Sequence, residues 1–190
     1  MCGRFSVNKE QVESWVLDNW NVSFECETNH DLRPTQSVST IIKCNESLTQ
    51  LNTTWGIKPS WSKKLLINAQ GETADTKKTF KDAFIHRRCL IPCSAWYEWR
   101  SEAGKSKQKY SFNAINEEPL LMAGIWYESE GIPQMLTLTT HPNERCGKIH
   151  KRMPVLIDKE NVDYWFNSET PELGTLIEPV TSESIAVTVC

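Results

Sequence analysis

The sequence predicts a single domain of the α+β class, built on a curled and mainly antiparallel β-sheet with several short helices. Three observations support this prediction. The chain has 190 residues, which is enough for one domain with a sizeable core. No linker, repeat or low-complexity segment divides it. Many short segments rich in β-forming residues follow one another, with a few helical stretches between them.

The first predicted element is an amphipathic helix over residues 9–20. Asn8 and Gln11, three positions apart, resemble a capping box at its start. Four apolar residues then recur at helical spacing: Val12, Trp15, Val16 and Trp20.

The segments that follow are mostly typical of strands. Residues 37–43 and 48–55 are β-rich and close enough to form a hairpin, and residues 76–86 predict a short helix. Two strand pieces, 89–91 and 96–99, are separated by Pro92. Further strands are expected near 108–115, 120–127, 134–140, 153–157 and 184–189, and further helices near 143–149, 159–166 and 171–177.

The charge distribution is uneven along the chain. The net charge is −3, but residues 158–190 hold seven acidic residues and one lysine, which leaves 20 basic and 17 acidic residues in 1–157. A local basic face can bind phosphates even on an acidic chain. Basic residues cluster at 63–64, 77–81, 86–88, 105–109 and 148–152. These clusters allow a nucleic-acid partner, although such clusters are more often solvated surface.

The remaining composition points to a reduced, cytoplasmic protein without a metal or organic cofactor. The seven cysteines are an odd number and include no C-x-x-C pair, so we expect neither a disulfide framework nor a metal site. No apolar run is long enough to span a membrane, and the N-terminus has no stretch typical of a signal peptide.

Cys2 is the strongest candidate for chemistry. Aminopeptidases remove Met1 when the second residue is small, and removal would leave Cys2 with a free α-amine beside its thiol. Such a 1,2-aminothiol condenses with an aldehyde and closes a thiazolidine ring. A free α-amine titrates near ~7.7–8.0, whereas a thiol with a pKa near ~8.5 is only a few per cent thiolate at neutral pH. We therefore expect the amine to attack first and the thiol to close the ring. The alternative is an ordinary cysteine that happens to lie second.

Three other residues could support proton transfer or positioning. Asn68 opens a polar run ending at Thr73 and could supply a fixed donor and acceptor, or belong to a plain loop. In a predicted strand Glu98 shares a face with Trp96, while Tyr97 and Trp99 point the other way. Burial among aromatic side chains would raise its pKa; the alternative is an edge glutamate that reaches solvent. Such a carboxylic acid can donate a proton near neutral pH.

His150 and Arg152 lie two residues apart, directly before Met153 and Pro154. Histidine titrates near physiological pH, and arginine binds phosphate with a planar fork of donors. The pair could therefore act on a phosphate-bearing substrate. A structural histidine is the alternative.

Eight blocks, in order along the chain, resemble the SOS-response-associated peptidase (SRAP) family of abasic-site processing proteins. They span residues 1 to about 157: Met1–Phe5, Pro34–Gln36, Trp55–Trp61, Asn68–Thr73, Arg88–Pro92, Trp96–Trp99, Leu138–Thr140 and His150–Pro154. The resemblance implies one barrel-like SRAP domain over 1–190, in which the acidic segment 158–190 packs on the motif-bearing core 1–157.

The resemblance also implies a function and the residues that perform it. The protein would bind single-stranded DNA as a monomer, associate with the bacterial nucleoid when DNA is damaged, and form a thiazolidine link to the aldehyde of an abasic site. Cys2 would be the nucleophile, Asn68 would orient the sugar and the Cys2 amine, Glu98 would open the sugar ring, and His150 would transfer protons in formation and reversal of the link. The family name also implies peptidase activity, namely autocatalytic removal of Met1 with Cys2 and Glu98 involved.

The implied DNA-binding residues form a second set. Arg4 and Arg152 would hold phosphates, assisted by Thr139 and the backbone near Gly3. Trp55 and the region of Pro34 would stack on bases or wedge between them, which suits sequence-tolerant binding of a single strand. Gln70 would lie at a further phosphate-binding position.

This chain departs from the family pattern at three positions. Gln70 stands where the family usually has arginine, which predicts weaker and less salt-sensitive DNA binding unless Lys63, Lys77 or Lys78 compensates. Ala95 stands where glycine is usual, and Lys151 replaces a residue that is commonly acidic or polar.

Two other classes of function stay open at this point. N-terminal-nucleophile glutamine amidotransferases also begin Met-Cys-Gly, so Cys2 could attack an amide; ammonia release from glutamine would identify that class. The third class is a noncovalent module for single-stranded DNA, in which the cysteines are inert.

Overall fold

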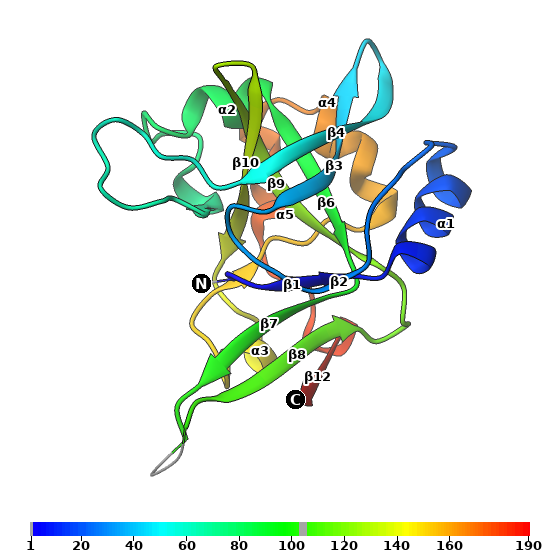
Figure 1. Cartoon of the computed structure of the whole chain (residues 1–190), viewed down its shortest axis with the longest axis vertical. Coiled ribbons are helices and arrows are strands. Elements are labelled where there is room, and N and C mark those ends of the chain that lie inside the picture. The colour runs from blue at the N-terminus through cyan, green and yellow to red at the C-terminus, as the bar shows by residue number, and fades with distance from the viewer. Residues whose placement is uncertain (1, 103–105) are drawn as a thin grey trace.

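Five strands form a closed barrel at the centre of the computed structural model, which describes residues 2–102 and 106–190 (Figure 1). Their order is β10–β4–β3–β6–β9, and β9 pairs with β10 to close the ring. The pairings are antiparallel except that of β10 with β4, which is parallel. The strands are β3 (Ser37–Cys44), β4 (Ser47–Trp55), β6 (Arg88–Cys93), β9 (Leu120–Ser129) and β10 (Ile132–Thr140). The curled, mainly antiparallel α+β fold is confirmed.

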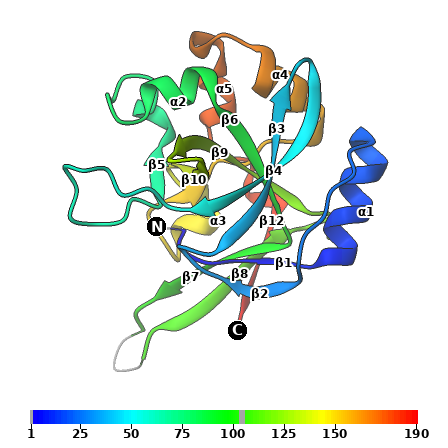
Figure 2. The ribbon, with the colours of Figure 1, turned by 45° about the horizontal axis from the view of Figure 1, so that its top comes forward.

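A second sheet crosses one end of the barrel, and two short strands extend the barrel wall. The second sheet has the order β12–β8–β7–β1–β2. Its strands are β12 (Ile185–Val189), β8 (Gln108–Ala114), β7 (Ala95–Arg100), β1 (Phe5–Val7) and β2 (Asn29–Leu32). Both β5 (Asn68–Gln70) and β11 (Met153–Pro154) pair with β10. Figure 2 shows the N-terminal end of the chain close to β5 and β10.

The helices lie outside the barrel. They are α1 (Lys9–Trp20), α2 (Lys81–His86), α3 (Glu144–Gly147), α4 (Val162–Asn167) and α5 (Gly174–Ile177). Four short 3-10 turns accompany them: η1 (Gly71–Thr73), η2 (Lys159–Asn161), η3 (Thr170–Leu173) and η4 (Ser182–Ser184). The predicted helices at 159–166 and 171–177 are therefore each a 3-10 turn followed by an α-helical turn.

Helix α1 has the predicted bounds, but only half of the predicted capping box forms. The Asn8 side chain accepts a hydrogen bond from the Gln11 backbone N–H at 3.4 Å. The Gln11 side chain instead donates to the carbonyl of Glu117 at 2.6 Å, and the Asn8 backbone N–H donates to Ser94 Oγ at 2.9 Å. Contacts with distant segments thus replace the return bond and fix the start of the helix against the sheets.

The structure corrects the prediction that Pro92 separates two strand pieces. Pro92 lies inside β6, opposite Leu121 on β9. Closure of the barrel depends on a close approach at Gly124, where a Cβ atom would lie 2.9 Å from the carbonyl oxygen of Leu136 on β10. The absence of a side chain at Gly124 therefore lets β9 and β10 pair.

The acidic segment 158–190 contacts both sheets. Strand β12 pairs with β8 along its whole length. The indole N–H of the fully buried Trp165 donates to the carbonyl of Cys89 at 3.3 Å. Arg88 donates to the carbonyls of Phe166 and Ser168 at 3.0 and 2.9 Å, so β6 holds the end of α4.

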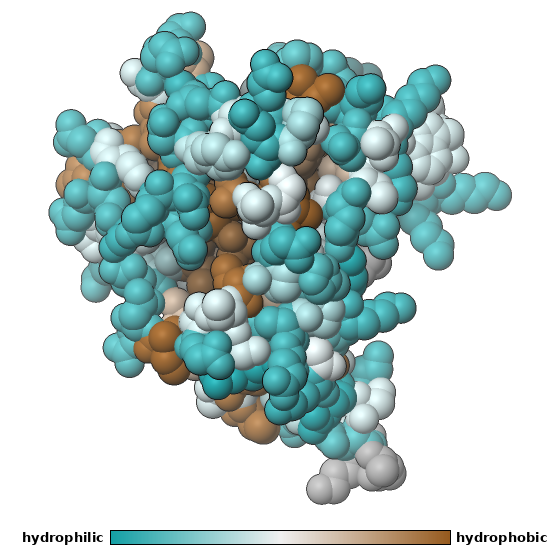
Figure 3. Space-filling view, turned by 180° about the vertical axis from the view of Figure 1, so that it is seen from behind, coloured by the Kyte–Doolittle hydropathy of each residue, from teal (hydrophilic) through white to brown (hydrophobic). Residues whose placement is uncertain are grey.

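The surface seen from behind is largely hydrophilic, with apolar side chains visible in a narrow central strip (Figure 3). Within the described residues, every helix is too short or too polar to cross a membrane.

Candidate active site

The site forms where the N-terminal segment, on the second sheet, meets strands β5, β10 and β11 of the barrel wall. Phe5 on β1 pairs with Trp96 on β7, and the Tyr97 N–H donates to the carbonyl of Arg4 at 2.9 Å. This ladder brings the segment that contains Cys2 alongside the strand that carries Glu98. The Cys2 side chain is completely buried.

Asn68 holds the backbone of Cys2. Its side-chain Nδ2 donates to the Cys2 carbonyl at 3.0 Å. Its Oδ1 accepts a short hydrogen bond from the hydroxyl of Thr137, the residue opposite Asn68 in the parallel β5–β10 pairing. Both ends of the amide are therefore fixed, which orients the N–H donor towards Cys2.

Glu98 and His150 lie close to each other beside Cys2. Glu98 is 5% exposed, and burial raises its pKa to about 7. Its Oε1 lies 3.7 Å from His150 Nδ1. Burial lowers the pKa of His150, although a backbone hydrogen bond with Arg152 opposes this effect. Glu98 can therefore exchange a proton near neutral pH, as the sequence led us to expect.

Burial also raises the pKa of the Cys2 thiol well above its usual range, and the nearby charge of Glu98 raises it further. The thiol is therefore protonated at neutral pH and needs a base before its sulfur can attack. Met1, on whose removal the predicted chemistry depends, lies outside the described residues.

The structure brings together the four predicted catalytic residues, Cys2, Asn68, Glu98 and His150.

The predicted DNA-binding residues lie around them, in several different environments. Arg4 is half-buried, donates to Asp31 Oδ1 at 2.7 Å, and lies 5.9 Å from the centre of the Trp99 ring. A phosphate that binds Arg4 would compete with Asp31.

The prediction that Trp55 stacks on bases is wrong. Trp55 is completely buried, and its indole N–H donates to the carbonyl of Ile67 at 2.9 Å, so neither face of the ring is open to a base. The exposed tryptophan of the same segment is Trp61, which is 67% exposed. The half-buried Pro34 and the adjacent Thr35 lie on the surface, and the Thr35 N–H donates to the Trp55 carbonyl.

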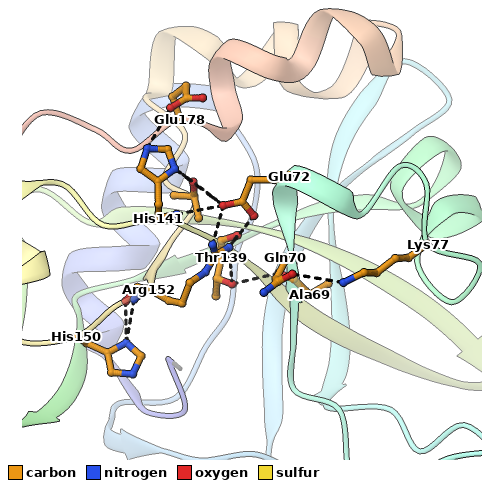
Figure 4. Close-up of polar contacts among 10 residues, drawn as sticks. Ala69, Gln70, Glu72, Lys77, Thr139, His141, His150, Arg152 and Glu178 are labelled. Carbon is orange, nitrogen blue, oxygen red and sulfur yellow. Dashed lines mark hydrogen bonds and ion pairs between the residues drawn. The ribbon is translucent and has the colours of Figure 1, made fainter.

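Gln70 is exposed at the end of β5, and a lysine lies beside it. Lys77 Nζ donates to Gln70 Oε1 at 3.3 Å (Figure 4). Lys63 and Lys78, the other two candidates for compensation, are exposed. The structure thus places the charge of Lys77 at the position where the motif of this chain lacks one.

Arg152 binds a carboxylate that was not among the predicted site residues. Its Nη1 and Nη2 each lie 2.7 Å from an oxygen of Glu72, and Nη2 also donates to the Thr139 carbonyl at 2.5 Å (Figure 4). Thr139 is buried, and its hydroxyl donates to the Ala69 carbonyl at 3.3 Å. One feature of the sequence could have pointed to Glu72, because it lies within the Asn68–Thr73 block.

No cluster of three metal-ligating His, Cys, Asp or Glu side chains occurs within residues 2–102 and 106–190. The seven cysteines are all free thiols.

Comparison with known proteins identifies the family of this chain. The profile of the family described as "SOS response associated peptidase (SRAP)" matches residues 1–189. The abasic site processing protein YoqW of Bacillus subtilis (strain 168) is 30% identical over an alignment that covers 97% of this chain and 90% of that protein. The abasic site processing protein YedK of Escherichia coli (strain K12) is 28% identical, with 89% and 81% covered.

Solved structures share the fold. A Bordetella bronchiseptica protein superposes with a TM-score of 0.85 at 21% identity, covering 100% of this chain and 99% of that one. A phage-related protein from the same organism gives a TM-score of 0.81 at 22% identity, with 100% and 94% covered. The sequence match over nearly the whole chain shows that this protein belongs to the SRAP family.

Proposed function

We propose that the protein binds single-stranded DNA and links Cys2 covalently to the ring-opened aldehyde of an abasic site, which shields the lesion from strand cleavage. The relatives named abasic site processing proteins support the class of lesion. The observation that carries the proposal is the hydrogen bond from Asn68 to the Cys2 carbonyl, which holds an N-terminal aminothiol beside the Glu98–His150 pair.

The reaction starts from a chain without Met1, whose autocatalytic removal by Cys2 and Glu98 is part of the proposal. Glu98, protonated below a pKa of about 7, donates a proton as the sugar ring opens to the aldehyde. The Cys2 amine attacks the aldehyde carbon, and the carbinolamine loses water to give an imine. The thiol then adds its sulfur to the imine carbon while its proton passes to the nitrogen, which closes the thiazolidine.

The high pKa of the Cys2 thiol supports this order of attack. A protonated thiol is a poor nucleophile, so the amine acts first and the sulfur waits for a base. His150 and the ionised form of Glu98 can each accept the thiol proton and return it to nitrogen, and the reverse transfers release the DNA. An amidohydrolase would need the sulfur to attack first, and for that reaction, as for removal of Met1 by Cys2, a base must take the thiol proton before the attack.

The strand would be held by Arg4, by the backbone at Gly3, by Arg152 and by the surface around Pro34 and Gln70. We assign the base-stacking role to Trp61 in place of Trp55, because its ring is exposed and basic side chains flank it.

Intact mass spectrometry tests the proposal. Met-free protein incubated with an abasic single-stranded oligonucleotide should gain one adduct that survives denaturation, and Cys2→Ser should abolish it. Cys190→Ser, which alters an exposed cysteine, is the matched control and should keep it. Protein and strand that separate completely under denaturing conditions would contradict the proposal. A complex seen only on a native gel would point to noncovalent binding, and ammonia release from glutamine would point to an amidohydrolase.

A further inference from the structure

We infer that Glu72 is a positioning residue that sets the orientation of His150 by holding Arg152. The inference rests on the proposed function, because it assigns Glu72 a part in the proton transfers of the same site. The contacts form a chain of three links. Figure 4 shows the first two, from Glu72 to the Arg152 guanidinium and from Arg152 to the His150 ring. The third runs from His150 to Glu98.

The first link is a two-point ion pair. Both carboxylate oxygens of Glu72 contact the Arg152 guanidinium at 2.7 Å. Two parallel bonds fix the plane of the guanidinium as well as its distance. The Arg152 side chain is only 17% exposed, and Nη2 also donates to the carbonyl of Thr139. The guanidinium is thus clamped between η1, which carries Glu72, and strand β10.

The second link runs through the backbone of Arg152. His150 Nδ1 lies 2.9 Å from the Arg152 carbonyl oxygen and 3.2 Å from the Arg152 backbone nitrogen. Either tautomer of the ring can use one of these groups, so the imidazole is held by the residue that Glu72 holds. A shift of Arg152 would therefore turn or move the ring that lies 3.7 Å from Glu98.

Glu72 is itself held on its other side. The His141 backbone N–H donates to Glu72 Oε1 at 3.2 Å, and the His141 ring lies 3.3 Å from Glu178 (Figure 4). Although burial raises the pKa of Glu72, its hydrogen bonds, chiefly with Arg152, lower it overall. Glu72 therefore keeps its negative charge at neutral pH, and its ion pair with Arg152 persists while Glu98 and His150 exchange protons.

The first test measures His150 directly by NMR titration of its imidazole in Glu72→Gln, which keeps the side-chain shape and removes the charge. The charged and titratable groups that face the ring are Glu98 from β7, the N-terminal amine, and Lys151 and Arg152 from its own segment. Loss of the carboxylate leaves Arg152 uncompensated and loosens a backbone bond that raises the His150 pKa. The pKa should fall further. An unchanged pKa and unchanged ring shifts would overturn the inference, whether or not the protein crosslinks DNA.

The second test asks whether Glu72 acts through Arg152. Glu72→Gln should slow adduct formation and release roughly tenfold or more, because misplacement of a catalytic group by a distant change can cost up to about a hundredfold. The double variant Glu72→Gln/Arg152→Gln should be within about twofold of Arg152→Gln alone, since linked residues are not additive. Glu118→Gln, which changes a similarly exposed carboxylate paired with Lys159 instead of Arg152, should react as wild type does. Effects that multiply would overturn the inference while leaving the proposed crosslink intact.

Discussion

Glu98 and Glu72 are two carboxylates of one site, and their surroundings drive their proton affinities in opposite directions. Glu98 is buried beside a histidine 3.7 Å away, and its pKa rises to about 7. The side chain of Glu72 is about a third exposed and forms an ion pair with Arg152, and its pKa falls. The first can therefore give and take a proton at neutral pH, whereas the second is a fixed charge. Burial and the kind of partner, more than the residue type, decide the role of a carboxylate in this site.

The largest expected effect is on the rate of adduct formation, which Glu98→Gln should slow more than Glu72→Gln. Glu98→Gln removes the proton donor and acceptor but keeps the shape, so adduct formation should slow by roughly a hundredfold or more, the usual contribution of a general acid–base group. The rate is read from the growth of the adduct on a denaturing gel with an abasic single strand. Glu72→Gln should lose less, because its part is positioning. Equal losses in the two variants would remove the distinction between them.

The second prediction is that ionised Glu98 destabilises the folded state. Its pKa is about 7 in the folded protein against 4.5 as a reference, so between these values the folded state holds the proton more tightly and stability falls as pH rises. Glu98→Gln should therefore raise the free energy of unfolding at pH 8, by at most roughly 3 kcal/mol. At pH 4.5 and below the gain should vanish. Urea denaturation at both pH values measures it, and a variant that is less stable than wild type at pH 8 would contradict it.

The third prediction is that Glu72, unlike Glu98, stabilises the folded state at neutral pH. Its folded pKa lies below the reference value, so its contribution to stability is present at neutral pH and is lost as pH falls through the folded pKa. Glu72→Gln should lower the melting temperature at pH 7 modestly, because the pair is partly exposed. At low pH, where wild-type Glu72 is itself protonated, the two proteins should converge. A difference that is independent of pH would show that the charge is not what stabilises the pair.

The contrast also shows which parts of the site the sequence could reveal. The raised pKa of Glu98 was predictable, because its aromatic neighbours are adjacent in the chain. Helix α1 and the β3–β4 hairpin were predictable for the same reason, since their signals are local. The partner of Glu72 was not, because Arg152 lies 80 residues away and only the pairing of β10 with β5 and β11 brings the two together.

Some strands were missed, and Trp55 was given a wrong role, for the same reason: the contacts that decide them are distant in the chain. Strands β1, β2 and β5 have only three or four residues each, too few for a periodic pattern, and β5 is defined by pairing with distant β10. Trp55 and Trp61 lie in one motif, and composition cannot say which is exposed. The alternation along β4 was the usable signal, because it places Trp55 on the same face as the buried Thr53.

The last and smallest prediction follows from the neutralisation of Arg152 by Glu72. Because Glu72 offsets the charge of Arg152, Lys77, which lies 3.3 Å from Gln70, should add an attraction for phosphate at this edge of the site that the Arg152 contact alone does not give. Lys77→Gln should flatten the slope of log affinity against log salt for single-stranded DNA by about one unit, and Gln70→Arg should steepen it by about one. Over a fourfold change in salt, one unit is about a fourfold change in affinity. Lys78→Gln is the matched control, because Lys78 is the exposed neighbour and has no contact with Gln70 among the described residues. If Lys77→Gln and Lys78→Gln flatten the slope equally, the DNA senses the general charge of the segment, and the contact with Gln70 has no special part in binding.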